Sequence, residues 1–123
     1  MHDKKYFVGK VSDYSKKKGW FFGYFANEDL LRSDLVEVAY QDVSNKKSSA
    51  DDWHYHKKCV EICIVTSGSA SLKINGKEFT VEEGGFWATY PESVVEDFST
   101  TKDTKLIVIK APSIPDDKFT KTL

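Results

Sequence analysis

The chain has 123 residues, of which 40% are hydrophobic and 30% are charged, and its formal net charge is -1. This length allows a single domain, 1–123, with a proper core, but not two domains. The nearly balanced charge gives no reason to expect nucleic acid or a membrane surface as a partner, and no apolar run is long enough to span a bilayer.

The N-terminal third combines aromatic residues with a lysine run. Lys16-Lys17-Lys18 is expected in a solvated turn, and no apolar segment of the signal-peptide kind follows the first residues, so we expect a cytoplasmic protein. Residues 20–25, Trp-Phe-Phe-Gly-Tyr-Phe, carry aromatic side chains on both faces. They predict a strand that is buried on both sides or covered by a second copy of the chain. Residues 26–34 follow as a loop or a single helical turn.

Residues 35–43 form the next predicted strand because apolar and polar side chains alternate there. Glu37 and Gln41 share one face of this strand. They either line a pocket or form a polar stripe that faces solvent. Residues 44–52 are polar and without periodicity, which indicates a loop beside the segment that follows.

The rest of the chain consists of short strand-like runs separated by turn residues. Asn75-Gly76 lies between two such runs and predicts a hairpin, because both residues of a tight hairpin turn need positive φ. The segment 111–115, with Pro112 and Pro115, cannot extend a central strand. Many short strands without an amphipathic helix predict a β-sandwich or barrel. The predicted strands cover residues 59–66, 70–74, 77–81, 86–90, 94–98 and 105–110.

Three residues that can bind a metal lie in one short segment: His54, His56 and Glu61. In an extended segment the spacing of two places both imidazoles on the same face. Glu61 has the opposite parity, so it joins them only if the backbone turns between the two sites, and Lys57-Lys58 is the expected place. A carboxylate among the apolar neighbours of the following strand would be costly without a positive partner. A divalent ion bound by all three side chains is such a partner.

Cys59 and Cys63 are the two cysteines of the chain. On one strand their Cα atoms are roughly 13 Å apart, too far for a disulfide between them. We therefore expect reduced thiols, most simply as small core residues, although Cys63 is also a candidate pocket residue.

Two spacing patterns in this sequence resemble the motifs of the cupin superfamily. The first is His54-x-His56, four residues, Glu61, six residues and Gly68. The second family motif runs glycine, five residues, Pro-x-Gly, two residues, histidine. This chain is similar in having Gly85 and Pro91, but Ser93 replaces a glycine and Glu96 stands where the family has its last histidine. The resemblance is to small single-domain bacterial cupins and covers roughly residues 36–110.

The resemblance implies an all-β fold, the cupin jelly-roll barrel or double-stranded β-helix, over about residues 20–112, with an N-terminal extension and a short C-terminal tail. It also implies a divalent metal ion on His54, His56, Glu61 and Glu96. Asp97 is the alternative to Glu96 if the register slips by one residue. Two imidazoles with carboxylate oxygens suit Fe, Mn, Ni or Zn. A homodimer is expected, since many cupins pair through strands like 20–25.

We expect a small metal-dependent enzyme: an isomerase, epimerase, lyase or oxygenase that acts on a sugar-like molecule or a hydroxy or keto acid. Glu61 or Glu96 would act as the general base in such an enzyme. The alternative is a non-catalytic cupin that binds or senses a small-molecule ligand. The expected substrate pocket consists of Glu37, Gln41, Cys63 and Tyr90.

Overall fold

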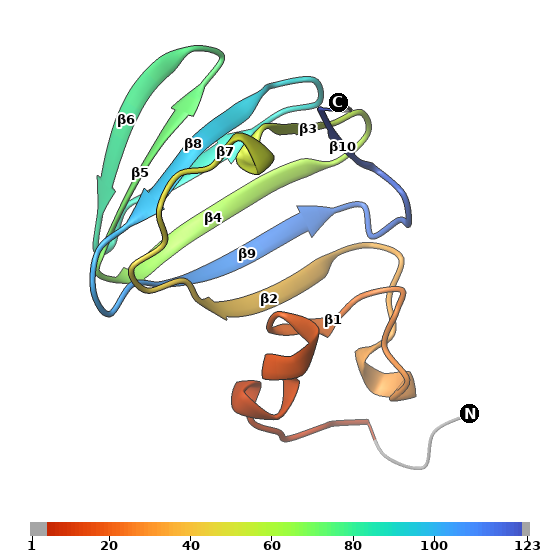
Figure 1. The fold of residues 1–123 in the computed structure, drawn as a ribbon. Helices are drawn as coiled ribbons and strands as arrows, with labels where there is room; N and C mark the ends of the chain where they lie inside the picture. Colours follow the sequence, from red (N-terminus) through yellow and green to blue (C-terminus); the bar gives the residue numbers. More distant parts are fainter. Residues whose placement is uncertain (1–4, 122–123) are drawn as a thin grey trace.

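The computed structural model describes residues 5–121, which form ten strands and three short 3-10 helices (Figure 1). The strands pair as two five-stranded antiparallel sheets, with the orders β1-β2-β9-β4-β7 and β10-β3-β8-β5-β6. The two sheets face each other as a jelly-roll sandwich, as the spacing of the strands and turns predicted. The strands are β1 (Trp20–Phe22), β2 (Glu37–Asp42), β3 (His54–His56), β4 (Val60–Ser67), β5 (Ser69–Ile74), β6 (Lys77–Glu82), β7 (Phe86–Thr89), β8 (Val95–Thr100), β9 (Lys105–Ala111) and β10 (Lys118–Thr120).

The core lies between the sheets, toward the end of the sandwich where β4 passes into β5. Ala39, Val65 and Ala70 have no exposed surface there, and Leu72, Leu106 and Trp87 pack in the same cluster. These residues come from alternate positions of strands in both sheets, as expected when each sheet buries only one face. The opposite end of the sandwich holds the polar side chains.

Gly68 is the corner at which the chain leaves one sheet and enters the other. Its φ of +77° is in the left-handed region, which glycine adopts without strain. A β-carbon at this position would lie 2.6 Å from the Thr104 Cα and closer still to the Thr104 hydroxyl. Thr104 is completely buried, and its hydroxyl donates to the Thr101 carbonyl at 2.8 Å. The corner is therefore closed by direct contact between Gly68 and the Thr104 backbone.

The predicted hairpin at Asn75-Gly76 is confirmed: β5 and β6 pair across it, and both turn residues have positive φ. The expected strand over residues 20–25 ends earlier, at Phe22, because Gly23 turns the backbone with a φ of +149°. The expected helical turn before β2 is η2 (Asp29–Leu31). Two other 3-10 helices were not predicted, η1 (Val11–Lys17) over the lysine run and η3 (Ala50–Asp52) in the polar loop.

Strand β10 is the element that the sequence pattern did not reveal. Its three residues pair antiparallel with β3, and Lys118 is the partner of His56. The prolines before it keep the segment out of the sheets, as expected, but the chain re-enters at the edge. Within residues 5–121 no helix has the length and apolarity needed to cross a membrane.

Candidate metal centre

The described residues that could bind a metal ion as a group are His54, His56 and Glu61. One ligand atom from each lies within 4.8 Å of the others. The Glu61 carboxylate is 3.4 Å from His56 Nε2 and 4.0 Å from His54 Nε2. The two histidines come from β3 and the carboxylate from β4. The chain bends at Lys57 and Lys58, as expected. This bend lets Glu61 face the two histidines although an uninterrupted strand would place it on the opposite side.

Each imidazole is oriented by a main-chain carbonyl. His54 Nδ1 is 2.8 Å from the Asp52 carbonyl oxygen, and His56 Nδ1 is 2.8 Å from the Asp117 carbonyl oxygen. A carbonyl can only accept, so both Nδ1 atoms carry a proton, and each Nε2 atom faces the Glu61 carboxylate in the cavity. Second-shell acceptors of this kind fix the ring orientation of histidine ligands in metal sites.

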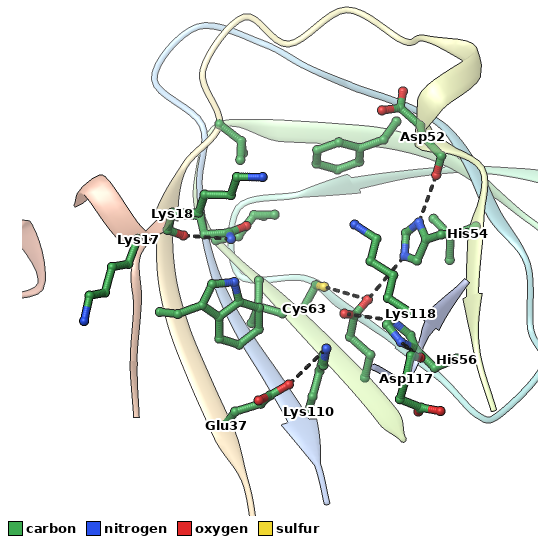
Figure 2. A pocket seen from close by; sticks show the side chains of 18 of the residues that line it. Lys17, Lys18, Glu37, Asp52, His54, His56, Cys63, Lys110, Asp117 and Lys118 are labelled. Carbon is green, nitrogen blue, oxygen red and sulfur yellow. Dashed lines mark hydrogen bonds and ion pairs between the residues drawn. The ribbon is translucent and has the colours of Figure 1, made fainter. Parts of the chain in front are cut away.

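The two aspartates are themselves fixed by their side chains. The Asp52 carboxylate accepts from the Ser49 main-chain N–H and from Lys46 Nζ, both at 2.8 Å, at the start of η3. The Asp117 carboxylate accepts from three consecutive main-chain N–H groups, those of Lys57, Lys58 and Cys59, at 2.9–3.2 Å. Asp117 therefore anchors the bend between β3 and β4 to the C-terminal segment, and Figure 2 shows its place beside His56. The sequence reasoning missed both residues. Only Asp52 has a local signal, the capping box with Ser49.

The groups that meet in this cluster are the Nε2 atoms of two imidazoles and one carboxylate. His56 Nε2 is buried and has no hydrogen-bond partner among the described residues. Burial opposes ionisation of the Glu61 carboxyl, but the imidazoles of His54 and His56 outweigh it and hold the pKa of Glu61 well below its usual range. Imidazole nitrogens and carboxylate oxygens that meet at one point are ligand types that divalent transition metals and zinc bind. The donor set therefore fits a divalent metal ion.

Glu96 does not join this cluster. Val95, the register partner of His54, lines the cavity, so Glu96 is on the other face of β8. A β-bulge follows: β8 gains one residue between Glu96 and Ser99 relative to β5, and Asp97 adopts a φ of +55°. Phe98 returns to the cavity, while Asp97 pairs with Lys73 at 3.2 Å. The fourth ligand expected from the second motif is thus directed away from the metal centre, and so is its alternative.

The centre opens into a cavity of about 900 Å³ between the sheets. Of the expected pocket residues, Glu37, Gln41 and Cys63 line it. Tyr90 does not: it is 71% exposed, because the alternation of β7 buries Trp87 and Thr89 and turns Tyr90 outward. Lys110, which the sequence reasoning overlooked, also lines the cavity.

Comparison with known proteins was made by sequence and by structure. No protein-family model and no curated protein matches the sequence. Solved structures do match. A variant of Streptomyces PAC13 with uridine is similar with a TM-score of 0.66 at 13% identity, over 100% of this chain and 93% of that chain. KdgF from Halomonas sp. has a TM-score of 0.58 at 14% identity, over 68% of this chain and 74% of that chain.

A cupin protein from Bacteroides fragilis matches with a TM-score of 0.54 at 17% identity, over 70% of this chain and 73% of that chain. The chain has a cupin fold. At these identities the likeness concerns the architecture alone. The expected jelly roll is therefore confirmed, and the chemistry of this protein has to be argued from its own residues.

Both cysteines of the protein are free and buried. Burial, the hydrogen bond with Asp117 and the charge of that carboxylate raise the pKa of the Cys59 thiol to about 12, and burial beside Glu61 raises the pKa of Cys63. Thiolates are the reactive form. In native protein at pH 8 we therefore expect both thiols to react with iodoacetamide at least about 100-fold more slowly than free glutathione.

Intact-mass spectrometry over time measures this alkylation. The same protein in guanidinium chloride is the control and should gain two adducts quickly. Rapid native addition of one adduct that maps to Cys59 would contradict the buried placement of this side chain.

Proposed function

We propose that this cupin binds one divalent metal ion on His54, His56 and Glu61 and uses it to hold a small chelating ligand. The observation that carries the proposal is the buried, unpartnered Nε2 of His56, aimed at a carboxylate that is itself held ionised. Two imidazoles and one carboxylate are a ligand set used by iron(II), and also by zinc and manganese. Such a metal supplies Lewis acidity to the oxygens that it chelates.

Three protein ligands leave coordination positions for a ligand that brings two adjacent oxygens. A hydroxy or keto acid or a sugar-like molecule has such oxygens and fits a cavity of about 900 Å³. The Glu61 carboxylate completes the cluster in which one ligand atom from each residue lies within 4.8 Å of the others. We therefore assign Glu61 the role of metal ligand rather than general base. The reactions that remain are those in which the metal organises the substrate: isomerisation, epimerisation, lyase chemistry or oxygenation.

The test is metal stoichiometry. Wild-type protein, stripped with a chelator and then given Zn²⁺ or Fe²⁺ anaerobically, should retain one equivalent after gel filtration. The double variant His54→Ala with His56→Ala should retain none while keeping the circular dichroism spectrum of the folded protein. Elemental analysis measures both.

His2→Ala is the matched control for the loss of a histidine, since His2 is the third histidine of the chain and lies outside the described residues. One equivalent of metal retained by the double variant would show that the ligands are wrongly assigned. Metal retained by wild-type protein without turnover of any hydroxy or keto acid would favour a binding or sensing role over an enzyme.

A further inference from the structure

A second charged group lies on the cavity wall beside the metal centre. Glu37, Lys110 and Glu61 are register partners on the neighbouring strands β2, β9 and β4. Lys110 Nζ donates to Glu37 Oε1 at 2.9 Å, and both side chains are almost fully buried. Figure 2 shows the pair at the base of the cavity. Cross-strand partners have Cβ atoms about 5 Å apart, so Lys110 is an immediate neighbour of Glu61.

The Glu37 carboxylate is fixed on both oxygens. Oε1 accepts from Lys110, and Oε2 accepts from the Ser113 hydroxyl at 3.1 Å. The Ser113 oxygen in turn accepts from the Tyr24 main-chain N–H at 2.9 Å. Lys110 Nζ also lies 5.5 Å from the centre of the Trp20 ring, where a cation is stabilised. The ammonium group is therefore held at one place before any ligand arrives.

Stability alone does not account for this pair. A buried ion pair is often no more stabilising than well-packed apolar residues of the same volume, and the next row of the same sheet, with Ala39, Val108 and Cys63, is apolar. An ammonium group can donate three hydrogen bonds. Among the described residues, Lys110 donates one to an oxygen atom, Oε1 of Glu37. Donors therefore remain for a group in the cavity.

The charges near the metal also favour an anion. Neutral imidazoles and one Glu61 carboxylate leave a divalent ion with a net charge of about +1, and Lys110 and Glu37 cancel each other. A monoanion bound to the metal would balance this charge. Burying the charge without a counterion is costly.

We propose that Lys110 binds an anionic oxygen of the ligand that the metal chelates. The ligand class is then a small 2-hydroxy or 2-keto acid, with its carboxylate shared between the metal and the Lys110 ammonium and Glu37 as the residue that positions Lys110. This inference rests on the proposed metal function and narrows its ligand from chelating molecules in general to acids. Neutral sugars lack the group that Lys110 recognises.

The experiment compares lactate with lactamide, its neutral analogue, by isothermal titration into Zn²⁺-loaded protein. Wild type should bind lactate at least about tenfold more tightly, the effect expected of a charge-assisted hydrogen bond. In Lys110→Met with Glu37→Gln, the preference for lactate over lactamide should shrink by at least about tenfold, to the part that the metal itself supplies, while Zn²⁺ stoichiometry stays at one. Lys17→Met removes a lysine from the cavity rim and should leave the preference unchanged.

Glu37→Gln alone provides a test if the double variant fails to fold. It removes the competing carboxylate, so lactate should bind several-fold more tightly than in wild type, while a merely structural pair would give weaker or unchanged binding. An undiminished lactate preference in the double variant, or no lactate preference in Zn²⁺-loaded wild type, overturns the role of Lys110 and leaves the metal proposal intact. Failure of wild type to take up metal overturns both.

Discussion

Replacing Gly68 with alanine is expected to lower the free energy of unfolding by at least about 3 kcal/mol. The left-handed φ of +77° costs a residue with a β-carbon about 1–2 kcal/mol, and the new methyl group also meets the Thr104 backbone. Thr104 cannot move away easily from this methyl group, because it is buried and its hydroxyl is hydrogen-bonded to the Thr101 carbonyl. Urea denaturation followed by tryptophan fluorescence measures the loss as a lower midpoint at unchanged slope.

Gly76→Ala is the matched control. Gly76 has a φ of +82°, and a β-carbon there would have no atom within 4 Å. Its replacement should therefore cost only the conformational part, about 1 kcal/mol. Equal losses for the two variants would show that contact with Thr104 does not limit position 68. Gly68 is roughly 23 Å along β4 from Glu61, so folded Gly68→Ala protein should still take up one equivalent of Zn²⁺.

The second large effect is expected for Asp117→Asn. The two oxygens of the Asp117 carboxylate accept hydrogen bonds from three main-chain N–H groups. In asparagine, an NH2 group replaces one of these oxygens, and this group donates hydrogen bonds instead of accepting them. Burial alone would raise the pKa of Asp117, but contacts with Cys59 and with the three N–H groups lower it, so the native partner is a carboxylate. We expect the free energy of unfolding to fall by about 3 kcal/mol, because the substitution removes or weakens hydrogen bonds to a charged group.

Asp117→Asn should also weaken Zn²⁺ binding by about 10- to 100-fold, the usual effect of disturbing the second shell of a metal ligand. The reason is that the Asp117 carbonyl orients His56. Competition with a chromophoric chelator measures this affinity. Asp116→Asn is the control, because Asp116 is exposed and its φ of +59° suits asparagine equally well. If Asp117→Asn is destabilised but keeps its Zn²⁺ affinity, Asp117 stabilises the bend and its contact with His56 does not affect metal binding.

Much of the architecture was readable from local chemistry. The Asn75-Gly76 turn, the alternation around Glu37 and the shared face of Cys59, Glu61 and Cys63 each depend on residues close together in the chain. The same holds for the three metal-binding candidates. Their spacing, together with the bend at Lys57 and Lys58, was sufficient to predict that they converge.

The parts that could not be predicted depend on partners distant in sequence. Asp117 reaches His56 across a separation of 61 residues, and nothing in its own neighbourhood indicates this contact. Lys110 is a candidate ligand-binding residue because the strand register places it between Glu37 and Glu61, and its own sequence neighbours do not indicate this position. The direction of Glu96 depends on the pairing of β8 with its neighbours and on the bulge at Asp97, which motif spacing does not specify.

The position of Glu96 changes the electrostatics of the centre. Two carboxylate ligands would nearly neutralise the charge of a divalent ion. With Glu61 as its one carboxylate ligand, the proposed metal would keep more of its charge and would polarise a chelated oxygen more strongly. The structure therefore favours a more electrophilic centre than the two motifs suggested.

The attachment of β10 to β3 bears on when the protein can acquire its metal. The three ligands emerge from the ribosome together, but the carbonyl that aims His56 is translated some 60 residues later. A nascent chain that already exposes the ligands therefore lacks the geometry for tight capture. Loading of the proposed metal would therefore follow docking of the C-terminal strand, and the finished cavity rather than the growing polypeptide would select the cation.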